Sequence, residues 1–324
     1  MRKSVQSAGG REERGNRLRA VLKFLVSTVL ILWLMYRIGP DNIWQSIRQA
    51  SPRWIVISTL LFVISNLLGA MQWHMILLNR HVKLSLFHCV WIYHIGLFFN
   101  NFLLGNVGGD AFRIYDIRRI SQRTETAFST VFLDRFIGFF ALTTLAMGVA
   151  GVMAYQLLEI RAVSTIGLVF LGWLFAMLFL FSKTFAQKFS WLSRLLLPAP
   201  IHVKAKAFYY NLHAFRHEKK MLTQVFMISL VIQALRILTH WSASRALGLN
   251  IAAGYFFLFI PIVALLATLP ISLGGLGIRE QSAVTLFAHV GAPSAQIVAF
   301  ELLAYIVGIL ATLPGGLFFA LRKR

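Results

Sequence analysis

The chain has 324 residues, of which 58% are hydrophobic and only 13% are charged, and its mean hydropathy is +0.70. A soluble domain of this length could not bury so much apolar surface, so the composition predicts a membrane protein. The formal net charge of +21 does not indicate nucleic-acid binding, because basic residues of membrane proteins gather in cytoplasmic loops and contact anionic headgroups. The single cysteine, Cys89, excludes an internal disulfide and a paired-cysteine metal site.

Apolar stretches long enough to cross a bilayer recur along the chain, at 20–36, 54–78, 127–154, 163–182, 221–244 and 297–320. The basic segment 1–19 precedes the first of them and is expected in the cytoplasm. No small-residue cleavage site follows Tyr36, so we interpret 20–36 as a retained helix and not as a signal peptide. Two further apolar runs, 87–104 and 253–269, lead directly into glycine-rich motifs.

Each glycine-rich motif places a glycine pair four residues before an arginine. The motifs are LLGNVGGDAFR (103–113), with Gly108, Gly109 and Arg113, and LPISLGGLGIRE (269–280), with Gly274, Gly275 and Arg279. Glycine pairs allow a tight chain reversal, and non-helical backbone at membrane depth needs protein or a cavity around it. The motifs therefore predict the tips of two hairpins that enter the membrane and return.

The distribution of basic residues favours two such dips over plain crossings. If 87–104 crossed fully, the arginines of 113–123 and the eight lysines and arginines of 183–220 would lie outside, against the positive-inside tendency. Dips at 87–112 and 253–279 place both segments in the cytoplasm, together with the tail 321–324. We therefore expect an all-α polytopic membrane protein with six spanning helices plus two re-entrant hairpins. Eight plain transmembrane helices are the alternative.

The second half of the chain repeats the first with an offset near 166 residues. The matching stretches are 54–78 with 221–244, 87–104 with 253–269, and 127–154 with 297–320. An odd number of crossings separates the halves, so we expect an inverted repeat, which is typical of secondary transporters. The expected organisation is one transmembrane domain, 20–320, with repeats at 54–154 and 221–320 and a basic interfacial segment at 183–220. Chance similarity between two glycine-rich turns is the alternative.

Four arginines are candidates for binding an anionic headgroup: Arg113, Arg135, Arg236 and Arg279. The backbone N–H groups of the glycine turns and the start of the following helix favour an anion, and a guanidinium adds a fork suited to phosphate. The alternative is that Arg113 and Arg279 only anchor the hairpins at the membrane interface.

Four of the eleven acidic residues cluster at the same motifs and are candidates for coupling or gating: Asp110, Asp134, Glu280 and Glu301. Asp110 and Arg113 are three residues apart and can pair on one helical face. Asp134 and Arg135 diverge by about 100°, so each is expected to have a partner elsewhere. Glu301 has no basic neighbour in sequence, and both a proton carrier and a static ion pair between helices remain open.

These motifs, together with FLDRF at 132–136, resemble the transmembrane-region family of lysylphosphatidylglycerol synthases, also called the flippase-like family, over about 20–320. In that family the membrane region of the multiple peptide resistance factor moves aminoacylated phosphatidylglycerol between leaflets. Related stand-alone members are linked to hopanoids and polyprenyl-linked sugars. The family often has proline where Gly105 stands here. No soluble aminoacyl-transferring domain follows residue 324, so synthase activity is not expected.

The resemblance implies a flippase for an anionic or modified lipid in the cytoplasmic membrane of a bacterium. An intramembrane lipid-modifying transferase and a non-transporting subunit of a lipid-synthesis complex are the alternatives. His74 and His240 lack metal-site spacing and HExxH is absent, so no cofactor or metal is expected. The expected partners are membrane lipids, especially anionic headgroups, with a lipid-synthesis enzyme and a second copy of the chain as further candidates. No nucleic acid is expected.

Overall fold

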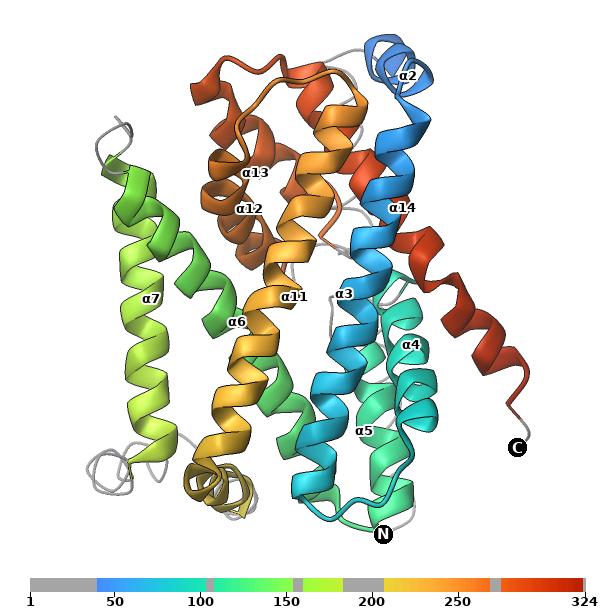
Figure 1. Cartoon of the computed structure of the whole chain (residues 1–324), viewed down its shortest axis with the longest axis vertical. Helices are drawn as coiled ribbons and strands as arrows, with labels where there is room; N and C mark the ends of the chain where they lie inside the picture. The colour runs from blue at the N-terminus through green and yellow to red at the C-terminus, as the bar shows by residue number, and fades with distance from the viewer. Residues whose placement is uncertain (1–39, 103–107, 154–159, 183–206, 269–274, 323–324) are drawn as a thin grey trace, which may run out of the picture.

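The computed structural model describes residues 40–102, 108–153, 160–182, 207–268 and 275–322, and the expected first helix at 20–36 lies outside them. The described part is built from helices (Figure 1). They are α2 (Pro40–Arg48), α3 (Pro52–Asn79), α4 (Leu86–Phe102), α5 (Gly108–Ser121), α6 (Thr124–Met153), α7 (Ile160–Phe181), η2 (Ala214–His217), α11 (Lys219–Ala246), α12 (Ala253–Ala267), α13 (Ile278–Phe287), η3 (Ala288–Val290) and α14 (Ser294–Ala320).

Four helices are long and apolar enough to cross a membrane: α3, α6, α11 and α14. They confirm the helices expected at 54–78, 127–154, 221–244 and 297–320. The shortest of them has 27 residues, which corresponds to about 40 Å at the α-helical rise and exceeds the thickness of a hydrocarbon core. Helix α7, with 22 residues, matches the stretch expected at 163–182. The protein is therefore an integral membrane protein with several apolar spans.

The two apolar runs before the glycine motifs form shorter helices, α4 and α12. Each packs against the helix that follows its motif, α5 and α13 respectively. In Figure 1, α4 and α5 lie beside the lower part of α3, whereas α12 and α13 lie beside the upper part of α11. The two helix pairs therefore occupy opposite ends of the bundle.

The helices α3 to α6, called the first set, and the helices α11 to α14, called the second set, have corresponding packing partners. The two longest central helices, α3 and α11, pack against each other. Helix α4 packs against α14, and its counterpart α12 packs against α6. Likewise α5 packs against α6 and α13 against α14, while α3 contacts α4 as α11 contacts α12. Exchanging the two sets thus leaves the pattern of contacts unchanged.

Glycines allow close approach where α4 meets its two neighbours. A Cβ atom on Gly109 of α5 would lie 1.7 Å from the carbonyl oxygen of Gly96 on α4. A Cβ atom on Gly315 of α14 would lie 2.0 Å from the carbonyl oxygen of His94. No larger residue fits at either position without moving backbone, so α4 is held tightly between α5 and α14.

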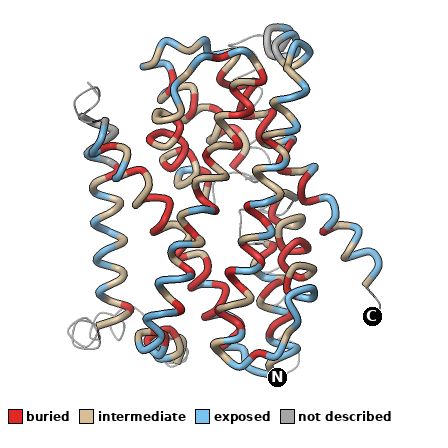
Figure 2. Tube along the Cα trace, in the orientation of Figure 1, coloured by how far each residue is buried: buried red, intermediate tan, exposed pale blue. Residues whose placement is uncertain are grey.

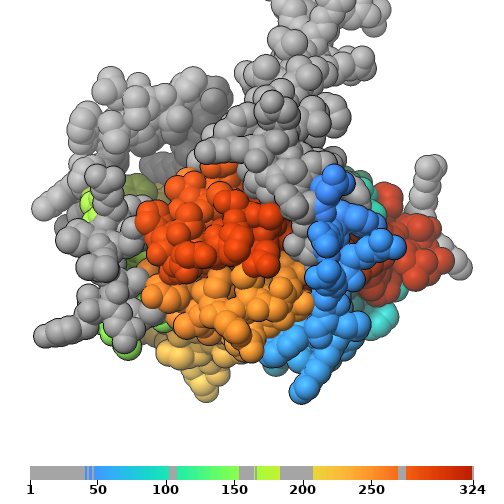
Figure 3. Space-filling model, turned by 90° about the horizontal axis from the view of Figure 1, so that it is seen from above, coloured from blue at the N-terminus to red at the C-terminus, as the bar shows by residue number. Residues whose placement is uncertain are grey.

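The buried residues run along the centre of the bundle, where the two sets of helices meet (Figure 2). Helix α7 stands at one edge and exposes apolar side chains such as Leu168, Leu171 and Leu178, as expected for a helix that faces lipid. Seen from above, α12, α13 and α11 lie next to the N-terminal part of α3 (Figure 3). This arrangement brings polar side chains from distant parts of the sequence to one central space.

Candidate functional site

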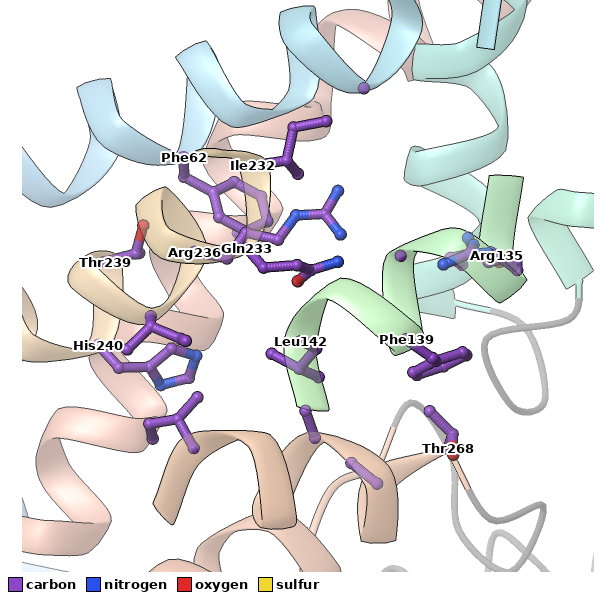
Figure 4. A pocket seen from close by; sticks show the side chains of 18 of the residues that line it. Phe62, Arg135, Phe139, Leu142, Ile232, Gln233, Arg236, Thr239, His240 and Thr268 are labelled. Atoms are coloured by element: carbon purple, nitrogen blue, oxygen red, sulfur yellow. The ribbon is translucent and has the colours of Figure 1, made fainter. Parts of the chain in front are cut away.

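A cavity of about 390 Å³ lies at the centre of the bundle, and α3, α4, α5, α6, α11, α12, α13 and α14 all contribute to its wall. Apolar side chains such as Phe62, Phe139 and Leu142 form part of the lining. Figure 4 shows Gln233, Arg236 and His240 projecting from α11 into this space. The charged and titratable side chains that line it are Tyr93, Asp110, Asp134, Arg135, Arg236, His240, Arg279 and Tyr305.

A network of four charged side chains connects α5 to α6. Arg113 donates to Asp134 at 2.7 Å and to Asp110 at 3.2 Å, and Arg135 donates to both oxygens of Asp110 at 2.8 and 3.0 Å. The pairing predicted between Asp110 and Arg113 is confirmed, as is the prediction that Asp134 and Arg135 have separate partners. Because each charge faces an opposite one, the network can stay ionised inside the membrane protein.

Arg113 is only 3% exposed and does not line the cavity. Its guanidinium carbon lies 4.1 Å from the ring centre of Trp73 and 4.7 Å from that of Tyr93. Two carboxylates and two aromatic rings therefore surround the Arg113 guanidinium. The arginine of the network that lines the cavity is Arg135 of α6. Arg113 thus stabilises the cavity wall by pairing with two of the residues that line it, Asp110 and Asp134.

Gln72 links this network to α11. Its amide nitrogen donates to Asp134 Oδ1 at 2.9 Å, and its oxygen accepts from the Ser229 hydroxyl at 2.7 Å. Both residues are buried within long apolar helices, where an unpaired amide or hydroxyl would be costly. The chain of hydrogen bonds thus fixes α3, α6 and α11 relative to one another.

Arg236 and Arg279 line the cavity without a carboxylate partner among the described residues. The Arg279 guanidinium lies over the Tyr305 ring, with its carbon 4.8 Å from the ring centre. Its Nε and Nη2 atoms are buried and make no hydrogen bond to a described residue, and the same holds for Nε of Arg236. Nε of Arg80 and Nε of Arg113 also make no hydrogen bond among the described residues, but of these four arginines Arg236 and Arg279 line the cavity, so their N–H groups can donate to an anion there.

The two glutamates of the second set of helices lie behind the cavity wall. Glu301 is fully buried, and its Oε1 lies 3.0 Å from His240 Nδ1, while its Oε2 has no hydrogen-bond partner within the described ranges. Glu280 is 2% exposed, and its Oε2 accepts from the backbone N–H of Gly277 at 2.6 Å, which caps the start of α13. Glu280 therefore has a structural function that the sequence did not indicate.

The glycine motifs lie only partly within the described residues: Gly108 and Gly109 begin α5, and Gly275 belongs to a turn before α13. Asn100 accepts from the backbone N–H of Gly109 at 2.8 Å, near the start of α5 at Gly108. Gly275 has a φ of +79°, a conformation that favours glycine. Gly274 lies outside the described residues. The first motif thus closes onto α4 through an asparagine side chain.

The sequence matches the family described as "Lysylphosphatidylglycerol synthase TM region" over residues 20–316. The chain belongs to this lysylphosphatidylglycerol synthase transmembrane-region family. It is 24% identical to a UPF0104 membrane protein of Pyrococcus horikoshii, over 93% of this chain and 96% of that protein. It is 27% identical to a UPF0104 membrane protein of Methanothermobacter thermautotrophicus, over 95% of this chain and 94% of that protein. Both similarities extend over nearly the whole length.

In this member of the lysylphosphatidylglycerol synthase transmembrane-region family, several site residues escaped prediction because they are uncharged and isolated in sequence. Gln72, Ser229 and Tyr305 stand in apolar helices without a motif around them. A second missed contact joins Asp116 of α5 to Arg322 beyond α14, with hydrogen bonds of 2.9 and 2.7 Å. A polar residue inside an apolar stretch predicts that it has a buried partner, but the sequence does not show which residue that partner is.

The histidines considered for a cofactor have other partners. His74 Nε2 lies 2.7 Å from the carbonyl oxygen of Leu84, and His240 contacts Glu301. Within the described ranges, no group of three or more histidine, cysteine or acidic side chains comes together to hold a metal ion. The cavity chemistry that the described residues offer is therefore that of arginine forks, carboxylates and one histidine.

Proposed function

We propose that the protein moves an anionic lipid between the two leaflets, with the lipid headgroup held in the central cavity. The observation that carries this proposal is the pair Arg236 and Arg279, whose buried N–H groups lack acceptors on the wall of a space shared by both sets of helices. The oxygens of a phosphate group would accept from these N–H groups and offset one of the two positive charges, since a guanidinium fork matches phosphate geometry.

The size of the cavity favours a headgroup over a whole lipid. Its volume of about 390 Å³ lies at the lower end of the range for small-molecule sites. A phosphoglycerol group fits such a space, whereas two acyl chains do not. The chains would stay in the surrounding hydrocarbon while the headgroup crosses through protein. This division avoids the cost of moving a charged group through lipid.

The arrangement of the helices supports the same proposal. We infer that α4–α5 and α12–α13 are re-entrant hairpins that enter from opposite sides of the membrane and that the two sets form an inverted repeat. The exchangeable packing pattern and the opposite positions of the hairpins in Figure 1 support this inference. Alternating access in inverted repeats occurs by rocking one repeat against the other around a central site. Both ends of the chain would then lie in the cytoplasm.

In this scheme the network of Asp110, Arg113, Asp134 and Arg135 would hold the helices of the first set together and would control access to the cavity from their side. Its charges balance, so it holds α5 against α6 without attracting a ligand strongly. Arg135 is the arginine of the network that lines the cavity, and its side chain is 31% exposed, so we assign it the contact with the headgroup that its neighbour Arg113 cannot make directly. The second set supplies the free arginines.

Reconstitution of the purified protein tests this function. In vesicles with a fluorescent phosphatidylglycerol, we expect the protein to raise the fraction of probe that reaches the inner leaflet, as measured by reduction of the outer probe with dithionite. A fluorescent phosphatidylcholine should move more slowly, because its quaternary ammonium adds a cation beside Arg236 and Arg279. Equal rates with protein and in protein-free vesicles would contradict the proposal, and a chemically altered lipid in the extract would favour the transferase alternative.

A further inference from the structure

We propose that Glu301 binds a proton when an anionic headgroup occupies Arg279, so that one proton accompanies each lipid. This inference rests on the proposed function and adds its energy source. The two sets of helices differ at one pair of corresponding positions, and this difference supports the proposal.

The asymmetry lies in two arginine–acid pairs at corresponding positions. In the first set, Arg113 forms an ion pair of 2.7 Å with Asp134. In the second set, Arg279 and Glu301 stand at the equivalent positions, yet they form no ion pair within 4.0 Å. The acid of the first set is thus neutralised by an arginine, whereas the acid of the second set contacts a histidine.

Arg279 contacts the same helix, α14, that carries Glu301. Its guanidinium lies over the ring of Tyr305, which is one helical turn beyond Glu301 on α14. Asp110 occupies the place three residues before Arg113 and pairs with it, but Leu276 stands at the corresponding place before Arg279. Arg279 therefore lacks the carboxylate that holds its counterpart, and a ligand in the cavity can take that place.

Glu301 has the surroundings of a proton-binding site. The carboxylate is fully buried, and in the part of the chain that the structure describes its Oε2 atom has no hydrogen-bond partner. A protonated Oε2 is a neutral group, which costs far less in this setting than an isolated charge. His240 contacts the other oxygen and also lines the cavity, so its ring can pass a proton between cavity water and the carboxylate.

The charged and titratable groups around Glu301 come from several helices. Helix α13 supplies Arg279 and Glu280, and both interact electrostatically with each other, while Glu280 also acts on Glu301. Helix α11 supplies His240 and Arg236, and α14 itself supplies Tyr305. On the cavity faces of α3 and α4 the titratable residue is Tyr93, which lies against Arg113. Helix α2 contributes Asp41 and Arg48, which are exposed.

Coupling between lipid and proton follows from the position of Arg279 among these groups. Arg279 and Glu301 both act electrostatically on Glu280, so the charge of Arg279 belongs to the same group of charges as the Glu301 carboxylate. A bound anion offsets the charge of Arg279, so Glu301 becomes neutral by binding a proton. By linkage, protonation of Glu301 strengthens the binding of the anion at Arg279 by the same factor by which the bound anion favours protonation. A monoanionic lipid and one proton then cross together without net charge.

The test uses sealed vesicles of phosphatidylcholine with the full-length protein and fluorescent phosphatidylglycerol, and pyranine in the lumen reports pH. With the outside one pH unit more acidic, we expect the inner-to-outer ratio of the probe to rise by up to about tenfold, as one proton per lipid requires. Glu301→Gln, which resembles the protonated form, should still exchange the probe but should give a ratio near that without a gradient. His240→Gln should slow the lumenal acidification that accompanies lipid movement.

Each result bears on either the coupling or the function. Probe movement by the wild type with no response to the gradient would overturn the coupling and leave the transport function intact. A full response in Glu301→Gln would overturn the assignment to this residue, and its thermal unfolding temperature in detergent shows whether the variant is folded. Absence of movement for every lipid probe would overturn the function and this inference with it.

Discussion

Replacing Arg279 with alanine should lower the rate of phosphatidylglycerol movement at least tenfold, while leaving the protein folded. Charged hydrogen bonds contribute about 1.5–3 kcal/mol each, and a loss of about 1.4 kcal/mol corresponds to a factor of ten. Two nitrogens of Arg279 have no hydrogen-bond partner among the described residues, so the side chain supports binding more than folding. The measurement is the dithionite assay on reconstituted wild-type and variant protein.

Two matched variants sharpen this experiment. Arg279→Lys keeps the charge but loses the planar fork, so an intermediate rate is expected. Arg118→Ala removes an exposed arginine of α5 away from the cavity and should transport at the wild-type rate. A wild-type rate in Arg279→Ala would remove this residue from the headgroup site. Equal losses in Arg279→Ala and Arg118→Ala would show that overall positive charge, and not the cavity, sets the rate.

Replacing Arg113 with methionine should have the largest effect on stability. The substitution leaves Asp134 with Gln72 as its remaining partner and leaves Asp110 with Arg135 alone. Breaking a buried ion pair by removing one partner costs about 3–5 kcal/mol, because the other charge remains buried. We expect a much lower unfolding temperature in detergent, measured by the fluorescence of the tryptophans.

The double variant Arg113→Met/Asp134→Leu separates the charge effect from the loss of packing. It removes both ends of the 2.7 Å pair, so it should be more stable than Arg113→Met alone. Arg118→Met on the same helix is exposed and should change the unfolding free energy by less than about 0.5 kcal/mol. If Arg113→Met unfolds at the wild-type temperature, the network does not stabilise the cavity wall.

The long helices could be predicted from sequence because their signal is local. Apolar length alone gave α3 as 54–78, and the structure has Pro52–Asn79. The glycine pairs likewise indicated that α4 and α12 end early, since a chain reversal needs glycine locally. In each case the deciding residues are neighbours in the chain. Helix rotation and tertiary contacts do not change such a prediction.

The partners within the site could not be predicted in the same way. Asp134 pairs with Arg113, which is 21 residues away, and with Gln72, which is 62 residues away. Which residues meet depends on the rotation and offset of whole helices, and a sequence pattern of period 3.6 leaves these open when a helix is apolar all round. The sequence also presented Arg113 and Arg279 as equivalent. Their difference follows from Asp110 and Leu276, which a residue-by-residue comparison of the two motifs would have revealed.

Transport by this scheme requires two hairpins that enter the membrane from opposite sides, and the accessibility of their outer ends tests this requirement most directly. In a Cys89→Ala background, single cysteines at Ile120 and Thr285 would lie on exposed surface at the far ends of α5 and α13. We expect a membrane-impermeant thiol reagent, applied outside intact cells, to label position 285 and not position 120, with both labelled after lysis. Labelling of both positions from outside would indicate plain crossings and would contradict the account.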